Sequence, residues 1–350
     1  MTAATTPLRA ELVQEAMAEE WDEFVGRQTG AAIYHRYAWR SVFSKVFGRQ
    51  TYYIATRNSA GAIQGVLPLT RLKSSLFGDF LVSLPYFNYG GAIAVSPAAY
   101  AALFEYCQSL AEQLGVRHAE LRHRADHVPH WPSRQDKVTL VLPLPNSVAV
   151  LNKQLGAKVR SQIKRPTRDG AVATMGGAEL LDDFHAVLAR NMRDLGTPSY
   201  PLAFFAEIMR ICGDTARIAI VRLDGRAVAA GLVICHGDTM EIPWASSLRE
   251  VNRSGVNMLL YATVIEHAVE LGLAHFDFGR CTRDSGTFRF KRQWGAEPQQ
   301  LYWHYWLKSG AELPQLNPQN PKYALAVAAW KRLPVPVASW LSSRLIGNLP

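Results

Sequence analysis

The feature that most constrains the fold is an order of elements that occurs twice along the chain. In each half the hydrophobic spacing predicts helices, then antiparallel strands, then one helix, then further strands. Strands with a central helix packed on them form an α+β, or mixed α/β, unit, so the order predicts one such unit used twice. A length of 350 residues is also more typical of two domains than of one.

The pattern places the elements of each half within a few residues. In the first half we expect helices over 11–29, 32–48 and 97–115, and strands over 51–58, 63–74, 79–95, 118–123 and 137–144. In the second half we expect helices over 147–169, 178–195, 200–213 and 256–272, and strands within 215–247, 274–280 and 298–307. The predicted domains are therefore 1–145 and 146–310, followed by a tail over 311–350 of short apolar and basic helices.

Composition excludes several classes of protein. The hydrophobic content of 48% supports packed cores, and no apolar run is long enough to span a bilayer. The acidic N-terminal stretch has no apolar signal region, and the four cysteines are scattered, so we expect reduced thiols and a cytoplasmic protein. The net charge of +9 favours an anionic partner, which leaves RNA, a phosphorylated substrate and a membrane surface open.

Common catalytic and metal motifs are missing from the sequence. There is no GxSxG, HExxH or Walker A pattern, and no pair of carboxylates typical of glycosidases. Four histidines lie close together in "HAELRHRADHVPH", namely His118, His123, His127 and His130, but a second ligand cluster is missing. We therefore expect no bound metal.

A basic and aromatic cluster, "GTFRFKRQWGAE" at 286–297, is the most informative local feature. It interleaves aromatic side chains with cations: Phe288, Phe290 and Trp294 with Arg289, Lys291 and Arg292. Such a cluster fits a solvated strand edge, a nucleic-acid contact or an active site that handles an anion, and the stretch alone does not choose among them.

Four stretches together resemble a known family. They are "LPYFNYGGAI" at 84–93, "KVRSQIKRP" at 158–166, "RNMRDLGTPSYP" at 190–201 and "FDFGRCTRDSGTFRFKRQWGAEP" at 276–298. Over most of residues 10–310 the chain resembles the FemAB-like proteins, which are built from two GNAT-type acyltransferase folds. Within that family it is most similar to the branch associated with PEP-CTERM/exosortase and exopolysaccharide systems of the cell envelope.

The resemblance implies an activity and two site residues. Fem ligases move an amino acid from aminoacyl-tRNA to an amine on a nucleotide-linked cell-wall precursor. Because this reaction forms a peptide bond, they are peptidyltransferases. Their aromatic–lysine pair at the acyl carbonyl corresponds to Phe290 and Lys291. Other proteins of this fold use acyl-CoA or acyl-carrier protein, so the resemblance implies acyl transfer to an amine rather than tRNA itself, with the donor as co-substrate and no permanently bound cofactor.

The chemistry of acyl transfer suits these residue types. Attack of an amine on an ester or thioester passes through an oxyanion, which a cation such as Lys291 stabilises. Burial beside Phe290 and Trp294 would lower the pKa of the amine, so Lys291 could instead carry a proton. Asp277, on the strand "HFDFGR", could orient or deprotonate the acceptor, and its alternative is a structural carboxylate paired with Arg280 or Arg292.

Two further groups are candidates for substrate binding. In "YFNYGGA" the residues Tyr86, Asn88, Tyr89 and Gly90 could bind sugar or amide groups where the glycine allows close approach. Basic and polar residues could bind phosphate: Arg160, Lys164, Arg190 and Arg193, with Tyr200 covering them. The alternatives are a tyrosine-rich core and a solvated helix.

One departure from GNAT enzymes concerns the donor. Those that bind coenzyme A carry R/Q-x-x-G-x-G/A at a helix N-terminus, whereas this chain has only "RSGV" before the helix at 256–272. A donor carried by tRNA or a carrier protein is therefore favoured over free acyl-CoA.

The tail and the overall activity each leave two alternatives. The tail is predicted either to pack on the first domain or to make a peripheral contact with the inner face of the inner membrane. The membrane alternative rests on Trp330, Leu333 and Trp340, which are interleaved with Lys331 and Arg332. The activity is predicted to be N-acyl transfer to a phosphorylated or glycan-linked acceptor. Its alternative is a non-catalytic protein that binds a glycan precursor or a partner of an export system.

Overall fold

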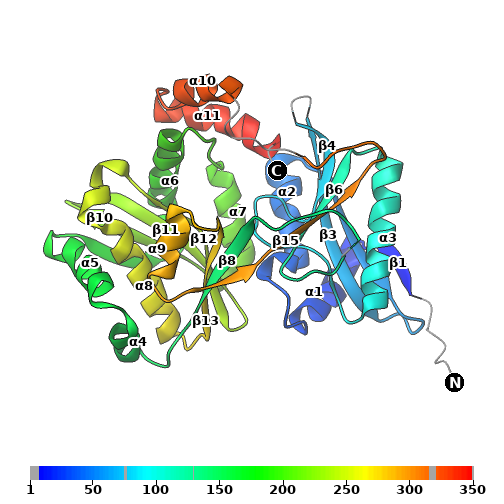
Figure 1. Ribbon diagram of the computed structural model, residues 1–350, viewed down its shortest axis with the longest axis horizontal. Coiled ribbons are helices and arrows are strands. Elements are labelled where there is room, and N and C mark those ends of the chain that lie inside the picture. The colour runs from blue at the N-terminus through cyan, green and yellow to red at the C-terminus, as the bar shows by residue number, and fades with distance from the viewer. Residues whose placement is uncertain (1–7, 75–76, 129, 315–320, 349–350) are drawn as a thin grey trace. The chain divides into compact units, whose positions relative to one another are not determined.

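The computed structural model describes residues 8–74, 77–128, 130–314 and 321–348, and Figure 1 shows the elements. The chain divides into two compact units. The first contains Met1–Lys137, Gln300–Gln315 and Asn348–Pro350, and the second contains Val138–Gln299 and Leu316–Gly347. Each unit is built on its own sheet of mainly antiparallel strands.

The sheet of the first unit has the strand order β1-β2-β3-β4-β6-β15-β7, with β5 paired to β3. Its strands are β1 Arg9–Leu12, β2 Thr51–Arg57, β3 Ile63–Ser74, β4 Gly78–Val82, β5 Ile93–Ala94, β6 His118–His123, β7 Ser133–Arg134 and β15 Tyr302–Leu307. Its helices are α1 Ala18–Gly26, α2 Arg40–Phe47 and α3 Pro97–Leu114. The pair β4–β6 is parallel, and α3 makes the crossover between these two strands.

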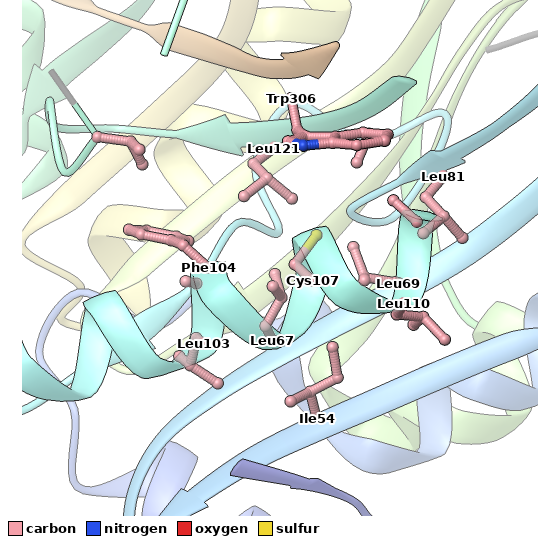
Figure 2. Packing of buried hydrophobic residues seen from close by; sticks show 14 of the residues in the cluster. Ile54, Leu67, Leu69, Leu81, Leu103, Phe104, Cys107, Leu110, Leu121 and Trp306 are labelled. Carbon is pink, nitrogen blue, oxygen red and sulfur yellow. The ribbon is translucent and has the colours of Figure 1, made fainter. Parts of the chain in front are cut away.

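Local sequence explains where α3 begins and ends. Ser96 accepts a hydrogen bond from the Ala99 amide at 3.2 Å, Pro97 occupies the first turn, and Gly115 ends the helix in the left-handed region. Figure 2 shows the face of α3 that packs on the sheet, where Leu103, Cys107 and other apolar side chains meet residues of several strands. This cluster forms one of the hydrophobic cores of the unit.

The sheet of the second unit has the order β14-β8-β13-β12-β11-β10-β9. Its strands are β8 Lys137–Pro143, β9 Val172–Gly176, β10 Ala216–Leu223, β11 Arg226–His236, β12 Thr239–Ser247, β13 His275–Thr282 and β14 Glu297–Gln300. Its helices are α4 Val148–Gln154, α5 Ala157–Arg168, α6 Leu181–Leu195, α7 Leu202–Cys212, α8 Val256–Glu270, α9 Gly286–Arg292, α10 Pro321–Trp330 and α11 Val335–Leu345. Here β12 and β13 are parallel, and α8 makes the crossover.

Each sheet thus has antiparallel strands followed by one parallel pair with a crossover helix. The predicted repeat of a mixed α/β unit is confirmed. The structure differs from the expected division at two strands, because β8 inserts in the second sheet and β15 in the first. β15 pairs with β6, as Trp306 with Ala119, and the single predicted strand over 298–307 is broken at Leu301.

Several predicted elements are shorter than expected. The helix over 11–29 begins only at Ala18, because 9–12 pair with β2. The helix over 32–48 is reduced to α2 preceded by short 3-10 turns, and the helix over 147–169 breaks where Leu155 and Gly156 are extended. The strand over 79–95 ends at Val82.

The two helices of the tail, α10 and α11, belong to the second unit. α11 contacts α6, and Ser342 Oγ accepts a hydrogen bond from the Ser199 amide at 3.0 Å. The buried side of α11, Ala338 and Ser342, faces elements of the second unit, whereas Asn348, just beyond α11, belongs to the first unit and accepts a hydrogen bond from Arg49 at 2.7 Å.

Candidate active site

The basic and aromatic cluster forms a short helix and not a strand edge. Ser285 Oγ accepts a hydrogen bond from the Phe288 amide at 3.1 Å, which caps α9 at its N-terminus. Asp284 has a φ of 60°, so the chain turns sharply between β13 and the helix. α9 packs against β13 and directs Lys291 at that strand.

Lys291 is buried, with 4% of its surface exposed. Its Nζ donates hydrogen bonds to the carbonyl oxygens of Gly279 at 2.7 Å and Arg280 at 3.0 Å. Burial lowers the pKa of this amine to about 8, against the opposing effect of nearby Cys281 and other acidic groups. An ammonium has three N–H bonds, and residues within the described ranges accept two of them.

Two buried carboxylates lie on adjacent strands close to Lys291. Glu241 and Asp277 are register partners in the parallel pair β12–β13, so their side chains share one face of the sheet. Asp277 Oδ1 accepts hydrogen bonds from Thr139 Oγ1 at 2.6 Å and from the Gly279 amide at 2.8 Å. The bond from Thr139 joins β8 to β13, close to the Gly279 and Arg280 carbonyls that bind Lys291.

Register pairing between β12 and β13 ends at Glu241 and Asp277. The described pairs run from Thr239–His275 to these two residues, although β12 continues to Ser247 and β13 to Thr282. The strands are thus joined at one end and unpaired toward the other, and Lys291 binds the β13 backbone beyond that point. Backbone carbonyls that would otherwise accept hydrogen bonds from a neighbouring strand are therefore available to the Lys291 ammonium.

Aromatic residues of α9 pack with rings of α8 and β13. Trp294 is buried, and its ring lies 6.4 Å from Phe290 and 6.3 Å from Tyr261, while Tyr261 stacks on Phe278 at 5.6 Å. Burial raises the pKa of the Tyr261 hydroxyl. These rings form one aromatic cluster that joins α9 to α8 and β13, the strand whose carbonyls accept from Lys291.

Sequence reasoning missed Glu241 and Thr139. The signal for Glu241 was a lone acid within the alternating strand "TMEIPWASS", where it is buried between apolar neighbours. Thr139 carried no comparable signal, because threonine is common in strands.

The predicted phosphate-binding residues lie on α5 and α6 in the second unit, and two of them are engaged by backbone carbonyls. The Arg160 guanidinium donates to the carbonyl oxygens of Asn152 and Leu155, at the end of α4. Arg193 donates to the Leu333 carbonyl at 2.6 Å and forms an ion pair with Asp194 at 2.7 Å. Lys164 is exposed on α5.

The remaining two predicted phosphate-binding residues, Arg190 and Tyr200, contact other side chains of the second unit. Arg190 forms an ion pair with Glu250 at 2.6 Å. Tyr200 stacks on Phe204 at 4.7 Å and lies 6.1 Å from Trp244, in an aromatic cluster before α7.

The segment with Tyr86, Asn88, Tyr89 and Gly90 lies in the first unit. It is an irregular buried turn and not part of the strand predicted over 79–95. Leu84 and Tyr86 have φ values of 54° and 77°, which are strained for residues with a side chain, and Gly90 has 145°. Tyr89 lies under a guanidinium of the same unit, with 3.8 Å from Arg124 to the ring centre.

Two histidines hold the peptide group that follows this segment. His35 Nδ1 accepts the Ala32 amide at 3.0 Å, so in its neutral form Nε2 carries the proton and donates to the Gly91 carbonyl at 3.0 Å. On the other side the Ala92 amide donates to His123 Nε2 at 3.0 Å. A Cβ at Gly91 would lie 2.3 Å from the His123 ring, so only glycine fits.

The His123 ring begins a chain of hydrogen bonds to a pocket. Since its Nε2 accepts, its Nδ1 donates to His304 Nδ1 at 3.1 Å, and His304 Nε2 donates to Asp126 at 2.8 Å. Burial lowers the pKa of both imidazoles, which agrees with neutral rings. Asp126 lines a pocket of about 380 Å³ together with Tyr100 and His127, whose rings stack at 4.2 Å.

The start of α8 is the position where a GNAT enzyme would hold the pyrophosphate of coenzyme A. Here Gly255 precedes the helix in the left-handed region, and α5 packs against it. The Gln162 carbonyl oxygen lies 3.4 Å and a Pro166 ring carbon 3.6 Å from the position of a Cβ at Gly255. α5 therefore occupies space beside this helix end.

These features define a class of fold, two GNAT-like units in tandem, and part of the second unit matches a GNAT-type domain. Residues 154–292 match the family model described as "Acetyltransferase (GNAT) domain", which ends at α9 and so includes Lys291. No curated protein matches the sequence.

Solved structures with the same fold span nearly the whole chain. FemX has 14% identity and a TM-score of 0.63, over 84% of this chain and 96% of that one. The L-PGS structure from Bacillus licheniformis has 14% identity and a TM-score of 0.55, over 94% and 96%. A tandem GNAT protein from the clavulanic acid biosynthesis pathway has 13% identity and a TM-score of 0.54, over 88% and 100%. Among the described residues, no helix is both long and apolar enough to cross a membrane.

Proposed function

We propose that the chain is an N-acyltransferase that moves an acyl or aminoacyl group from a carrier-bound donor to an amine of a phosphorylated or glycan-linked acceptor. The observation that carries this proposal is Lys291, a buried amine of lowered pKa held on two backbone carbonyls within the GNAT-type domain. Buried ionisable groups with shifted pKa values are concentrated at functional sites.

In the proposed reaction the acceptor nitrogen attacks the carbonyl carbon of the donor ester or thioester. The carbonyl π electrons move to oxygen, and the third N–H of the Lys291 ammonium donates to this oxyanion. Collapse of the intermediate breaks the bond to the donor alcohol or thiol, which leaves with the proton lost by the amine. The products are an amide and the free carrier.

Asp277 and Glu241 act through Lys291 in this proposal. Their negative charges oppose the effect of burial on the pKa of the amine and so keep more of it as ammonium near neutral pH. Phe290 and Trp294 form the dry side of the site. Asp277 therefore serves as a positioning residue, because its hydrogen bonds to Thr139 and Gly279 fix the strand that holds the lysine.

The donor is proposed to be aminoacyl-tRNA or an acyl-carrier protein. The space that α5 occupies beside the start of α8 argues against the usual coenzyme A contact, and the exposed Lys164 gives α5 a cation for a phosphate. Similarity of fold to FemX and to L-PGS is consistent with an aminoacyl donor. A role in cell-envelope or exopolysaccharide synthesis is proposed from the resemblance of the sequence alone.

The test is transfer from labelled donors to hydroxylamine and to amine-bearing nucleotide-linked sugars. The donors are unfractionated tRNA charged with labelled amino acids, a labelled acyl-carrier protein and acetyl-CoA. Lys291→Met should lower the transfer rate by about 100-fold, the usual effect of removing one oxyanion donor. The matched control is Lys153→Met, an exposed lysine of the same unit, which should change the rate by less than about twofold.

A folded Lys291→Met protein that retained activity within about threefold would overturn the role of the lysine. Absence of transfer from every donor, combined with retention of one of the sugars on the protein, would favour the non-catalytic binding alternative.

A further inference from the structure

The two tail helices are anchored to the second unit through α6 and the segment that follows it. Val327 of α10 lies against Gly196, where a Cβ would meet its Cγ1 at 2.5 Å, and Gly196 ends α6 in the left-handed region. Arg193 donates to the Leu333 carbonyl between the two tail helices, and Ser342 accepts from Ser199. Figure 1 shows α10 and α11 at the α6 helix.

The opposite side of α10 is apolar and exposed. Leu325 is two residues from Val327, which places it about 200° around the helix, and 79% of its surface is exposed. The sequence from Ala324 to Trp330 contains no charged or polar side chain except the indole nitrogen, and all of its alanines are exposed. An exposed helix face of a globular protein normally carries polar residues.

α11 repeats this arrangement. Its buried side is formed by Ala338 and Ser342, one turn apart, whereas Val337 and Trp340 lie on the other side and are 43% and 58% exposed. Arg344 lies over the Trp340 ring at 3.6 Å from its centre. The outer side of α11 thus combines large apolar groups with a cation.

The charged side chains of the tail from residue 313 onward have one sign. Three exposed cations adjoin the apolar groups, at Lys331, Arg332 and Arg344, and residues 313–350 contain no Asp or Glu. A helix face that only keeps a protein soluble mixes both signs. We call Leu325, Val337, Trp340, Lys331, Arg332 and Arg344 the tail face.

We infer that the tail face lies on the surface of an anionic lipid bilayer, with its apolar side chains in the headgroup region and its cations on lipid phosphates. Apolar exposure alone would equally suit a second copy of this chain. The basic, acid-free composition selects an anionic surface, because two such faces would repel each other. This inference does not depend on acyl transfer.

Co-sedimentation of the full chain with vesicles tests it. The wild type should bind vesicles of phosphatidylcholine with 30 mol% phosphatidylglycerol at low salt about tenfold more strongly than phosphatidylcholine alone, and less as salt rises. The variant L325E/W340E should bind the anionic vesicles at least about tenfold more weakly. Val172→Glu is the matched control, because Val172 is an apolar residue of β9 in the same unit and is 61% exposed, and the variant should bind as the wild type does.

Three results would overturn the inference. They are wild-type protein that stays in the supernatant with anionic vesicles at low salt, equal binding to both lipid compositions, and equal loss of binding in V172E and L325E/W340E. If the wild type does not bind vesicles but forms a dimer in light scattering, and the L325E/W340E variant is monomeric, the tail face would be assigned to a second copy of the chain. Circular dichroism of each variant shows whether it is folded.

Discussion

Replacement of His118 by phenylalanine should make the first unit less sensitive to acid. The His118 ring stacks on Phe80 at 4.7 Å between centres, and burial lowers its pKa from 6.5 to about 4, against the attraction of Glu120. The folded state therefore binds fewer protons than the unfolded state between these two pH values. Stability from this residue is present above pH 6.5 and is lost as the pH falls toward 4.

The size of the effect follows from the two pKa values. Between pH 7.5 and pH 5 the histidine should remove about 2 kcal/mol from the free energy of unfolding, approaching about 3 kcal/mol at lower pH. Phenylalanine keeps a ring on Phe80 but has no proton to bind, so the His118→Phe protein should lose about 2 kcal/mol less over the same interval.

Native-state hydrogen exchange of peptides covering β6 measures this difference within one unit, even if the two units unfold separately. The comparison is between the pH-dependent losses of the two proteins, so a constant change in stability from the substitution cancels. Equal losses between pH 7.5 and pH 5 in wild type and variant would refute the reasoning.

Two further predictions concern the first unit. Gly91→Ala should lower the free energy of unfolding by about 3 kcal/mol, because its Cβ would lie 2.3 Å from the His123 ring and 2.7 Å from a backbone oxygen. Gly156→Ala, where no atom lies within 4 Å of the new Cβ, is the control in thermal denaturation, and equal shifts in the two variants would disprove the steric cause. Glu120→Leu should cost about 3 kcal/mol or more in urea denaturation, because it removes the 2.7 Å partner of the buried Arg122 guanidinium; a loss below about 1 kcal/mol would mean that the pair is not a buried charge pair.

Helices with clear end signals could be predicted from the sequence alone. The extent of α3 follows from Ser96, Pro97 and Gly115, and α8 follows from a long apolar pattern. The repeat of the whole unit was visible for the same reason, since each element order depends on local spacing.

Strand neighbours were not predictable in the same way. The alternating pattern identified β8 and β15 as strands, but pairing is a long-range choice, and each of these strands joins the sheet of the other half. The turn at Leu84 and Tyr86 was missed because neither residue favours a positive φ, and the surrounding histidine and arginine contacts stabilise it.

Part of the candidate site could also be predicted. Lys291 was identified from its aromatic neighbours and from the resemblance, whereas its binding to the Gly279 and Arg280 carbonyls needed the structure. Glu241 is distant from Lys291 in the sequence and becomes its neighbour only through the pairing of β12 with β13.

The pH dependence of acyl transfer by the wild type tests the central claim most directly. With hydroxylamine as acceptor, which stays neutral over the range used, the single-turnover rate depends on the protonation of the enzyme. If the Lys291 ammonium stabilises the oxyanion, the rate should be level up to a pH of about 8 and then fall by about tenfold for each further pH unit, following the pKa of Lys291. The residual rate of Lys291→Met should show no such fall. A wild-type rate that rises or stays level between pH 8 and pH 9.5 would contradict the account, and a rise would assign Lys291 the role of a base.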